Sequence, residues 1–214
     1  MDNKLPRQAH AVLNLASRQR KAEKIRRLLA LPADNSRPLT LLEIGTGSGG
    51  IAHYLATLSP AFQVFAVDTV DNRQINGNYH FRLVTNTHLP FDDSFFDIVI
   101  TNHVIEHVGE ASEQAHHLEE IARVLKPGGK GYLAVPNRWM LVEPHYRLAF
   151  LSYLPRSLRS PYLRLRGKGH FYDCEPLTLP ELEKLLQQSG LQYHNLCAEA
   201  LKQTLAIEHP TSTI

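Results

Sequence analysis

The sequence predicts an α/β fold, a doubly wound and mostly parallel sheet covered by helices on both faces. From residue 39 onward, apolar strand-like segments alternate with helical patterns, as in parallel sheets built from crossover connections. A glycine-rich turn at residues 45–50 follows the first strand, and Asp68 ends the second strand. Such sheets bind ligands at the carboxyl ends of their strands, so these features predict a ligand site at that edge.

The length, composition and cysteine content of the chain indicate what kind of protein it is. A chain of 214 residues suits one domain of ordinary size, and 43% hydrophobic with 21% charged residues is typical of a soluble globular protein. Two cysteines, Cys174 and Cys197, are too few for a secreted disulfide scaffold. No apolar run approaches the ~20 residues of a membrane span, and the first residues lack a signal-peptide core. We therefore expect a cytoplasmic protein.

The first 36 residues are predicted to form a basic helical segment ahead of the main domain, residues 37–214. They hold eight Lys or Arg against three Asp or Glu, with apolar residues at helical spacing that indicate one or two amphipathic helices. A solvated helix face explains this charge, and binding to an anionic membrane or nucleic acid is the alternative. Residues 32–38, rich in proline and polar residues, are typical of a linker.

The remaining elements follow in order. Apolar runs predict five strands and a sixth near the end of the chain, while helical patterns fill the intervals. The predicted strands are 39–44, 63–68, 80–84, 96–101, 131–135 and 191–197, with helices at 51–58, 112–125 and from Thr178, whose Glu181 completes a capping box. Side chains at the carboxyl ends of the first five strands should share one edge: Glu43, Asp68, Thr85, Asn102 and Pro136.

The glycine-rich turn reads E-x-G-x-G-x-G from Glu43 onward. Glycines suit a backbone that turns tightly and approaches a ligand closely. The same spacing satisfies the dinucleotide-binding fingerprint, so the turn alone leaves both adenosine cofactors open. Glu43 suits a ligand with a positive ammonium or sulfonium, and it would be unfavourable beside a pyrophosphate.

Three further motifs decide between these cofactors: residues 89–99 with Leu-Pro-Phe-Asp-Asp, residues 104–108 with Val-Ile-Glu-His-Val, and residues 124–131 with Lys-Pro-Gly-Gly. In this order, the chain resembles the class I S-adenosylmethionine-dependent methyltransferases, in the branch that includes quinone-biosynthesis O-methyltransferases. The resemblance covers residues 39–137 and extends more weakly to 190. It implies a Rossmann-like sheet of order 3-2-1-4-5-7-6, N-terminal helices as a lid, and S-adenosylmethionine as cofactor. Only residues 201–207 remain for strand seven, which would be short or missing.

The resemblance also assigns the cofactor pocket. It places Asp68 at the ribose, Thr69 beside the adenine and Asn102 at the methionine end. Thr85 and Asn86 stand where the family usually carries an acid for the adenine amino group, and plain turn residues are the alternative. The methionine part is assigned to the loop and the acid before it: Glu43, Gly45, Thr46, Gly47, Ser48 and Gly49.

Transfer to a hydroxyl requires a base, and histidine is the usual choice near neutral pH. The candidates are His107, His145 and His170, each with a structural role as the alternative. His103, Glu106 and His107 would share one face of a helix, a possible metal set. Related quinone and small-RNA methyltransferases carry E-x-x-E-H here and can use a divalent ion. Because His103 replaces the first Glu, which weakens the case for magnesium, we expect no metal and keep this set, with His145 as a fourth ligand, as the alternative.

Residues 138–175 replace the short connection expected after the fifth strand. They are aromatic, apolar and basic, with seven Lys or Arg against three Asp or Glu. In this fold such an insertion covers the acceptor pocket, so we expect a lid over a small or lipid-like acceptor, with peripheral membrane contact as a further role. Nucleic acid is not expected. The prediction is methyl transfer to oxygen; a non-catalytic cofactor-binding module, a metal-assisted quinone-type or 2'-O-methyltransferase, and a nicotinamide-dependent oxidoreductase are the alternatives.

Overall fold

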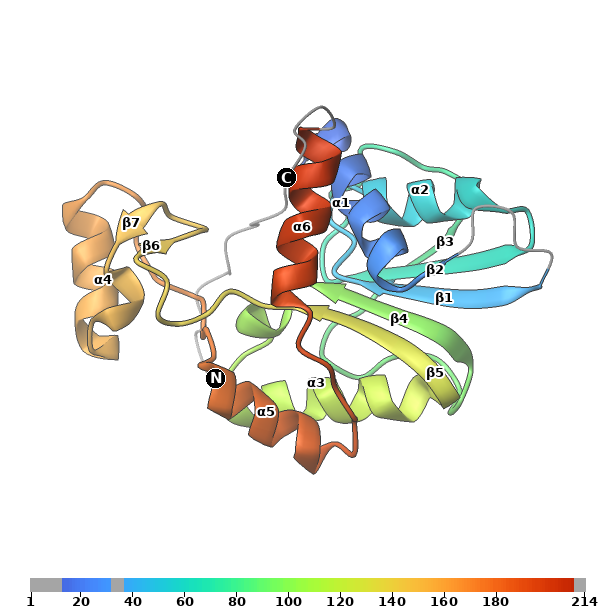
Figure 1. The fold of residues 1–214 in the computed structure, drawn as a ribbon. Coiled ribbons are helices and arrows are strands. Elements are labelled where there is room, and N and C mark those ends of the chain that lie inside the picture. Colours follow the sequence, from blue (N-terminus) through green and yellow to red (C-terminus); the bar gives the residue numbers. More distant parts are fainter. Residues whose placement is uncertain (1–12, 32–36, 210–214) are drawn as a thin grey trace.

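The computed structural model describes residues 13–31 and 37–209 (Figure 1). Its central sheet has five parallel strands in the order β3-β2-β1-β4-β5, which confirms the first five places of the predicted order. The strands are β1 Leu39–Ile44, β2 Phe62–Asp68, β3 His80–Leu83, β4 Phe96–Asn102 and β5 Leu125–Ala134. Since all five run in one direction, their carboxyl ends meet at one edge.

Helices cover both faces of this sheet. On one side lie α1 Leu15–Leu28, α2 Gly50–Leu58 and α6 Cys197–Glu208, and on the other lie α3 Ala111–Val124 and α5 Leu179–Gln188 (Figure 1). The side chain of Asn14 caps α1, accepting a hydrogen bond from the Ser17 amide at 2.8 Å. The predicted capping box at Thr178 and Glu181 is confirmed. Residues 1–12 and most of the predicted linker lie outside the described residues.

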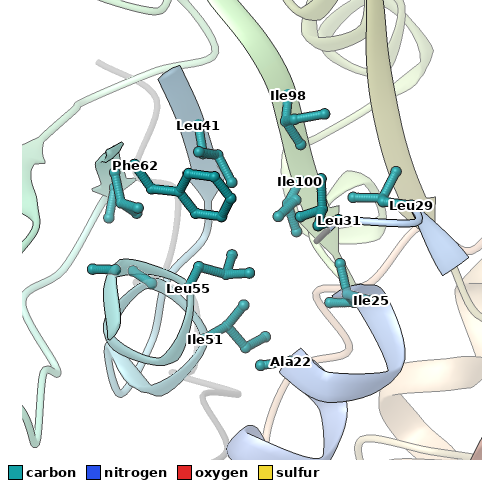
Figure 2. Packing of buried hydrophobic residues seen from close by; sticks show 14 residues of the cluster. Ala22, Ile25, Leu29, Leu31, Leu41, Ile51, Leu55, Phe62, Ile98 and Ile100 are labelled. Carbon is teal, nitrogen blue, oxygen red and sulfur yellow. The ribbon is translucent and has the colours of Figure 1, made fainter. Parts of the chain in front are cut away.

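The apolar core explains why α1 is ordered against the sheet. Ala22 and Ile25 of α1 are fully buried beside Ile51 and Leu55 of α2, and Ile100 of β4 belongs to the same cluster (Figure 2). Burial of such side chains contributes about 1.5–3 kcal/mol each. The basic face of α1 remains outside this contact, so the helix covers the core with one face and presents charge on the other.

The predicted sixth strand, at residues 191–197, is wrong, and the residues left for a seventh strand, which was expected to be short or missing, form no strand. Residues 191–196 form no strand, and residues 197–208 form α6. This segment reads Ala-Glu-Ala-Leu-Lys-Gln-Thr-Leu-Ala, which is rich in strong helix formers and poor in β-branched residues. The helix lies against α1, where Arg27 donates a hydrogen bond to Gln203 at 3.3 Å. Within the described residues, the sheet therefore ends at β5.

The insertion after β5 folds into a small unit beside the sheet (Figure 1). It contains the antiparallel hairpin β6 Val142–Glu143 and β7 Leu148–Ala149, the 3₁₀ turn η2 Leu151–Tyr153, and α4 Arg156–Leu165. It has its own apolar cluster, made of Tyr146, Leu148, Leu151, Leu163, Tyr172 and Cys174. Among the described helices, none combines the length and apolar composition that crossing a bilayer requires.

Candidate functional site

The glycine-rich loop joins β1 to α2 at the carboxyl edge of the sheet. Gly45, Gly47 and Gly49 have φ angles of 72°, 54° and 77°, a region that residues with a Cβ avoid. The Gly47 amide donates a hydrogen bond to the Asp68 carboxylate at 2.8 Å. The loop and the end of β2 are thus held together as one surface.

The buried side chain of Glu43 holds the glycine-rich loop in place through hydrogen bonds. Its side chain is 2% exposed and accepts hydrogen bonds from the Thr46 hydroxyl at 2.7 Å and the Ala52 amide at 2.9 Å. Burial raises the pKa of Glu43 to about 8, with nearby Asp68 adding to the rise and Arg18 opposing it. These bonds identify a loop-holding role; contact with the methionine part stays a prediction.

We expect Glu43 to make stability depend on pH. Its folded-state pKa lies above the ordinary carboxyl value of 4.5, so the folded protein holds this proton more tightly than the unfolded chain. The free energy of unfolding should therefore fall as pH rises from about 4.5 towards about 8. Glu43→Gln keeps an oxygen acceptor but no charge, and urea titrations should show a flatter pH curve for this variant. Parallel curves for the two proteins would contradict the assignment.

Other predicted pocket residues differ in how well they fit a cofactor. Asp68 also accepts the Thr69 amide at 2.7 Å. Asn102 Oδ1 and Ser48 Oγ are buried with no hydrogen-bond partner, and buried polar atoms normally have one, so both fit a polar ligand at this edge. Thr85 and Asn86 are exposed, and Asn86 Oδ1 accepts the His88 amide at 2.9 Å. This bond favours the turn-residue alternative for Asn86.

A second group of polar side chains follows β4. We call His103, Glu106, His107 and His145 the histidine cluster. Nε2 of His107 lies 3.1 Å from Nε2 of His145, and Nδ1 of His103 lies 3.4 Å from the Glu106 carboxylate. On its other side, Nδ1 of His145 lies 2.7 Å from Glu143. The insertion thus brings His145 against residues 103–107, as the predicted fourth ligand would require.

The expected helix for residues 103–107 is wrong in detail. His103 has a left-handed backbone with φ of 59°, and only the 3₁₀ turn η1 Ile105–His107 follows it. The third candidate base, His170, is exposed and lies outside the cluster; its carbonyl accepts a bond from Arg164 at 3.2 Å. The cluster is therefore assembled from two segments, residues 103–107 and His145 of the insertion, and not from one face of a single helix.

Two residues that contact the cluster were not predicted from the sequence to belong to the site. Glu143 is buried and orients His145, and Cys174 Sγ lies 3.6 Å from Nδ1 of His107. Burial raises the pKa of Cys174, which keeps its thiol protonated. Burial alone would lower the pKa of His145, but the bond to Glu143 and the other nearby carboxylates outweigh it and raise that pKa. The spacing of Glu143 two residues before His145 was the only available signal.

Comparison with known proteins agrees with this geometry. The family described as "Methyltransferase domain" matches residues 16–196. The ubiquinone biosynthesis O-methyltransferase of Caulobacter vibrioides is 34% identical over 110 residues, 47% of this chain and 42% of that protein. Its namesake from Rhizobium leguminosarum is 28% identical over 172 residues, 74% of this chain and 62% of that protein. The chain thus spans less than two thirds of either relative.

The fold has solved counterparts. A structure described as a SAM-dependent methyltransferase from Methanosarcina mazei aligns with a TM-score of 0.54 at 23% identity, over 72% of this chain and 80% of that one. At this identity the likeness concerns the fold, and it agrees with the parallel sheet and its flanking helices. With the family match over most of its length, this chain belongs to the class I S-adenosylmethionine-dependent methyltransferases, as its motifs predict.

Proposed function

We propose that this chain transfers the methyl group of S-adenosylmethionine to an oxygen atom of an apolar, lipid-like acceptor. One observation carries the proposal: the insertion that sets His145 beside His107 also exposes an apolar surface. The printed function of the two bacterial relatives, O-methylation in ubiquinone biosynthesis, supports oxygen and an apolar acceptor.

The cofactor supplies a methyl group already activated on a sulfonium, so the chain mainly has to align the reactants. In this proposal Asp68 accepts hydrogen bonds from the ribose hydroxyls, and Asn102 and Ser48 bond the methionine end; the buried, unpartnered Asn102 Oδ1 and Ser48 Oγ support these roles. In the displacement, the bond from the methyl carbon to oxygen forms as the bond to sulfur breaks. The proton of the acceptor hydroxyl passes to the histidine cluster, which lies past the end of β4 on the same edge.

The acceptor class follows from the apolar patch, which we define as the large exposed apolar side chains of residues 139–142, just before and within β6, and of residues 150–153, just after β7. Its members are between 40% and 65% exposed: Trp139, Met140, Leu141, Val142, Phe150 and Tyr153. They are contiguous, since the Phe150 amide bonds the Leu141 carbonyl at 2.7 Å and the rings of Trp139 and Tyr153 lie 5.2 Å apart. Patches of this kind mark interaction sites. The exposed Arg147 in the hairpin turn favours an anionic lipid surface, which would deliver the acceptor.

A labelling experiment tests the proposal. The chain is incubated with methyl-labelled cofactor and with either the lipid extract or the aqueous extract of bacterial cells. We expect label to enter the lipid fraction as a methyl ether or ester. A double variant of the patch, Leu141→Ser with Phe150→Ser, should lower this transfer while leaving the affinity for S-adenosylhomocysteine unchanged.

Three outcomes would contradict the proposal. Label on nitrogen would contradict oxygen as the acceptor atom. Label found only in the aqueous fraction would contradict a lipid-like acceptor. Stoichiometric cofactor binding with no transfer to either extract would favour the non-catalytic module.

A further inference from the structure

A cavity of about 220 Å³ lies between α1 and α6, which run side by side (Figure 1). It exists because residues 197–208 fold as a helix beside α1 and not as part of the sheet. Most of its charged side chains are cations, and its lining is Ser17, Arg18, Arg20, Lys21 and Lys24 from α1 with Thr204, Ile207 and Glu208 from α6. We call this space the basic cavity.

The lysines of the basic cavity lack the ion pairs that other cations of α1 form. Towards the end of α1, Glu23 pairs with both Arg26 and Arg27 at 2.7 Å. Among the described residues, no carboxylate forms such an ion pair with Lys21 or Lys24. Positive charges that are held together without counter-ions repel each other and attract anions. The cavity is therefore suited to a negatively charged ligand.

The surroundings of Lys21 show that this charge is held at a cost. Burial lowers the pKa of Lys21 to about 8, and the nearby charges of Lys24 and Arg18 lower it further. Of the groups around Lys21, Glu208 acts in the opposite direction. At neutral pH Lys21 still carries its proton for most of the time, because this pKa lies above 7. An anion between the two lysines would stabilise both charges.

The basic cavity also offers hydrogen-bond donors. Nε of Arg18 is buried without a hydrogen-bond partner, and buried polar atoms normally have one. The Ser17 hydroxyl can donate another bond. Helix α1 begins at Leu15 with no acidic residue in its first turn, so the positive end of its dipole adds to the potential. Ammonium, guanidinium and hydroxyl donors together are suited to an oxyanion.

We propose that the basic cavity binds the phosphate group of a small phosphate ester, either free in solution or as the head group of a lipid. Four cations against one carboxylate favour a dianion, and a phosphate monoester carries about 1.5–2 negative charges at pH 7. Sites for drug-sized ligands usually measure about 300–1,000 Å³. A cavity of about 220 Å³ therefore fits a phosphate with a short carrier and is too small for a whole nucleotide.

The basic cavity lies beside the cofactor loop and not within it. Arg18 is the lining residue that approaches the loop, since a methyl group on Gly50 would lie 2.7 Å from the Cβ of Arg18. Lys21 and Lys24 follow about one and two turns further along α1. The inference goes beyond the proposed function, and its test requires no methyl transfer.

Inorganic phosphate and glycerol 3-phosphate are the probes. The full-length chain is titrated with each by calorimetry at constant ionic strength, with and without saturating S-adenosylhomocysteine. We expect one saturable site that S-adenosylhomocysteine leaves occupied. Lys21→Met and Lys24→Met should each weaken phosphate binding at least about tenfold, since each removes a charged hydrogen-bond donor. Both variants should keep their affinity for S-adenosylhomocysteine, and circular dichroism confirms that they are folded.

Two further variants separate the site from general charge. Lys202→Met removes the same charge from α6, at an exposed position outside the cavity, and should change phosphate affinity by less than about twofold. Glu208→Gln removes the one carboxylate among the lining residues and should tighten phosphate binding about two- to fivefold. A loss of affinity in Glu208→Gln would contradict the inference.

Vesicles identify the source of the phosphate. Sedimentation is compared for phosphatidylcholine vesicles with and without phosphatidic acid, whose head group is a phosphate monoester. If phosphatidic acid increases binding and Lys24→Met abolishes the increase, the ligand is a lipid head group. If Lys24→Met weakens only the titration with glycerol 3-phosphate, the ligand is a free phosphate ester.

Three results would overturn the inference. Displacement of phosphate by S-adenosylhomocysteine would mean that the cavity belongs to the cofactor site. Equal losses in Lys21→Met and Lys202→Met would mean that general surface charge explains the binding. No saturable binding of either probe would refute the site. In each case methyl transfer to a lipid-like acceptor could still be observed, so failure of this inference is distinguishable from failure of the proposed function.

Discussion

Replacing Asp68 with Ala is expected to lower the affinity for S-adenosylhomocysteine at least about 100-fold. Hydrogen bonds to a charged group contribute about 1.5–3 kcal/mol each, and two ribose hydroxyls would bond this carboxylate. Each 1.4 kcal/mol corresponds to about tenfold in affinity. The change also frees the Gly47 and Thr69 amides, which Asp68 holds in the described structure. Calorimetric titration with S-adenosylhomocysteine measures the effect.

Asp71→Ala provides the matched control. Asp71 lies three residues further on, is exposed, and pairs with Arg73 at 2.8 Å. We expect its removal to leave cofactor affinity within about twofold, since exposed pairs contribute little. If Asp68→Ala binds as the control does while both variants remain folded, the assignment of the cofactor site is wrong.

Gly49→Ala is expected to impair both folding and cofactor binding. A methyl group at this position would collide with the Tyr79 hydroxyl and would lie 2.8 Å from the Ile75 carbonyl oxygen, and φ is 77°. The left-handed backbone alone costs about 1–2 kcal/mol. Because the carbonyl belongs to the main chain, the loop must shift to relieve the contact. We expect a larger loss of stability than φ explains and at least about a tenfold loss of affinity.

Gly128 serves as a control that measures the cost of the left-handed backbone without a steric collision. It has the same φ of 77°, but a methyl group there would meet nothing within 4 Å. Gly128→Ala should therefore cost only about 1–2 kcal/mol of unfolding free energy and leave cofactor affinity intact. Thermal unfolding and S-adenosylhomocysteine titration of the two variants give the comparison. Equal losses in both would show that the Gly49 loop has room to adapt.

The sheet was predictable because its signals are local. Strands β1, β2 and β4 are short apolar runs, and Glu43 with the glycines marks the turn that follows β1. The end of the chain was not predictable, because the sixth strand was inferred from a short run at residues 191–197 and the seventh only from the family pattern. Residues 197–208 carry helix-forming side chains, and their local preference agrees with α6.

The histidine cluster shows the corresponding limit for the site. Its near residues, 103–107, stand out as a motif in the sequence. Their neighbour His145 is 38 residues away, and the insertion's own fold decides that it, and not His170, reaches His107. The buried partner Glu143 depends on the same hairpin. Contacts that one folded segment makes with another cannot be read from spacing.

The left-handed backbone at position 103 also constrains how this site can evolve. Asparagine, aspartate and histidine adopt such angles more often than other residues with a side chain, whereas valine and isoleucine tolerate them poorly. Sequences that lose the imidazole should therefore carry Asn, Asp or Gly at this position more often than other residues. The left-handed main chain would then restrict which residues occupy position 103, whatever the role of the side chain.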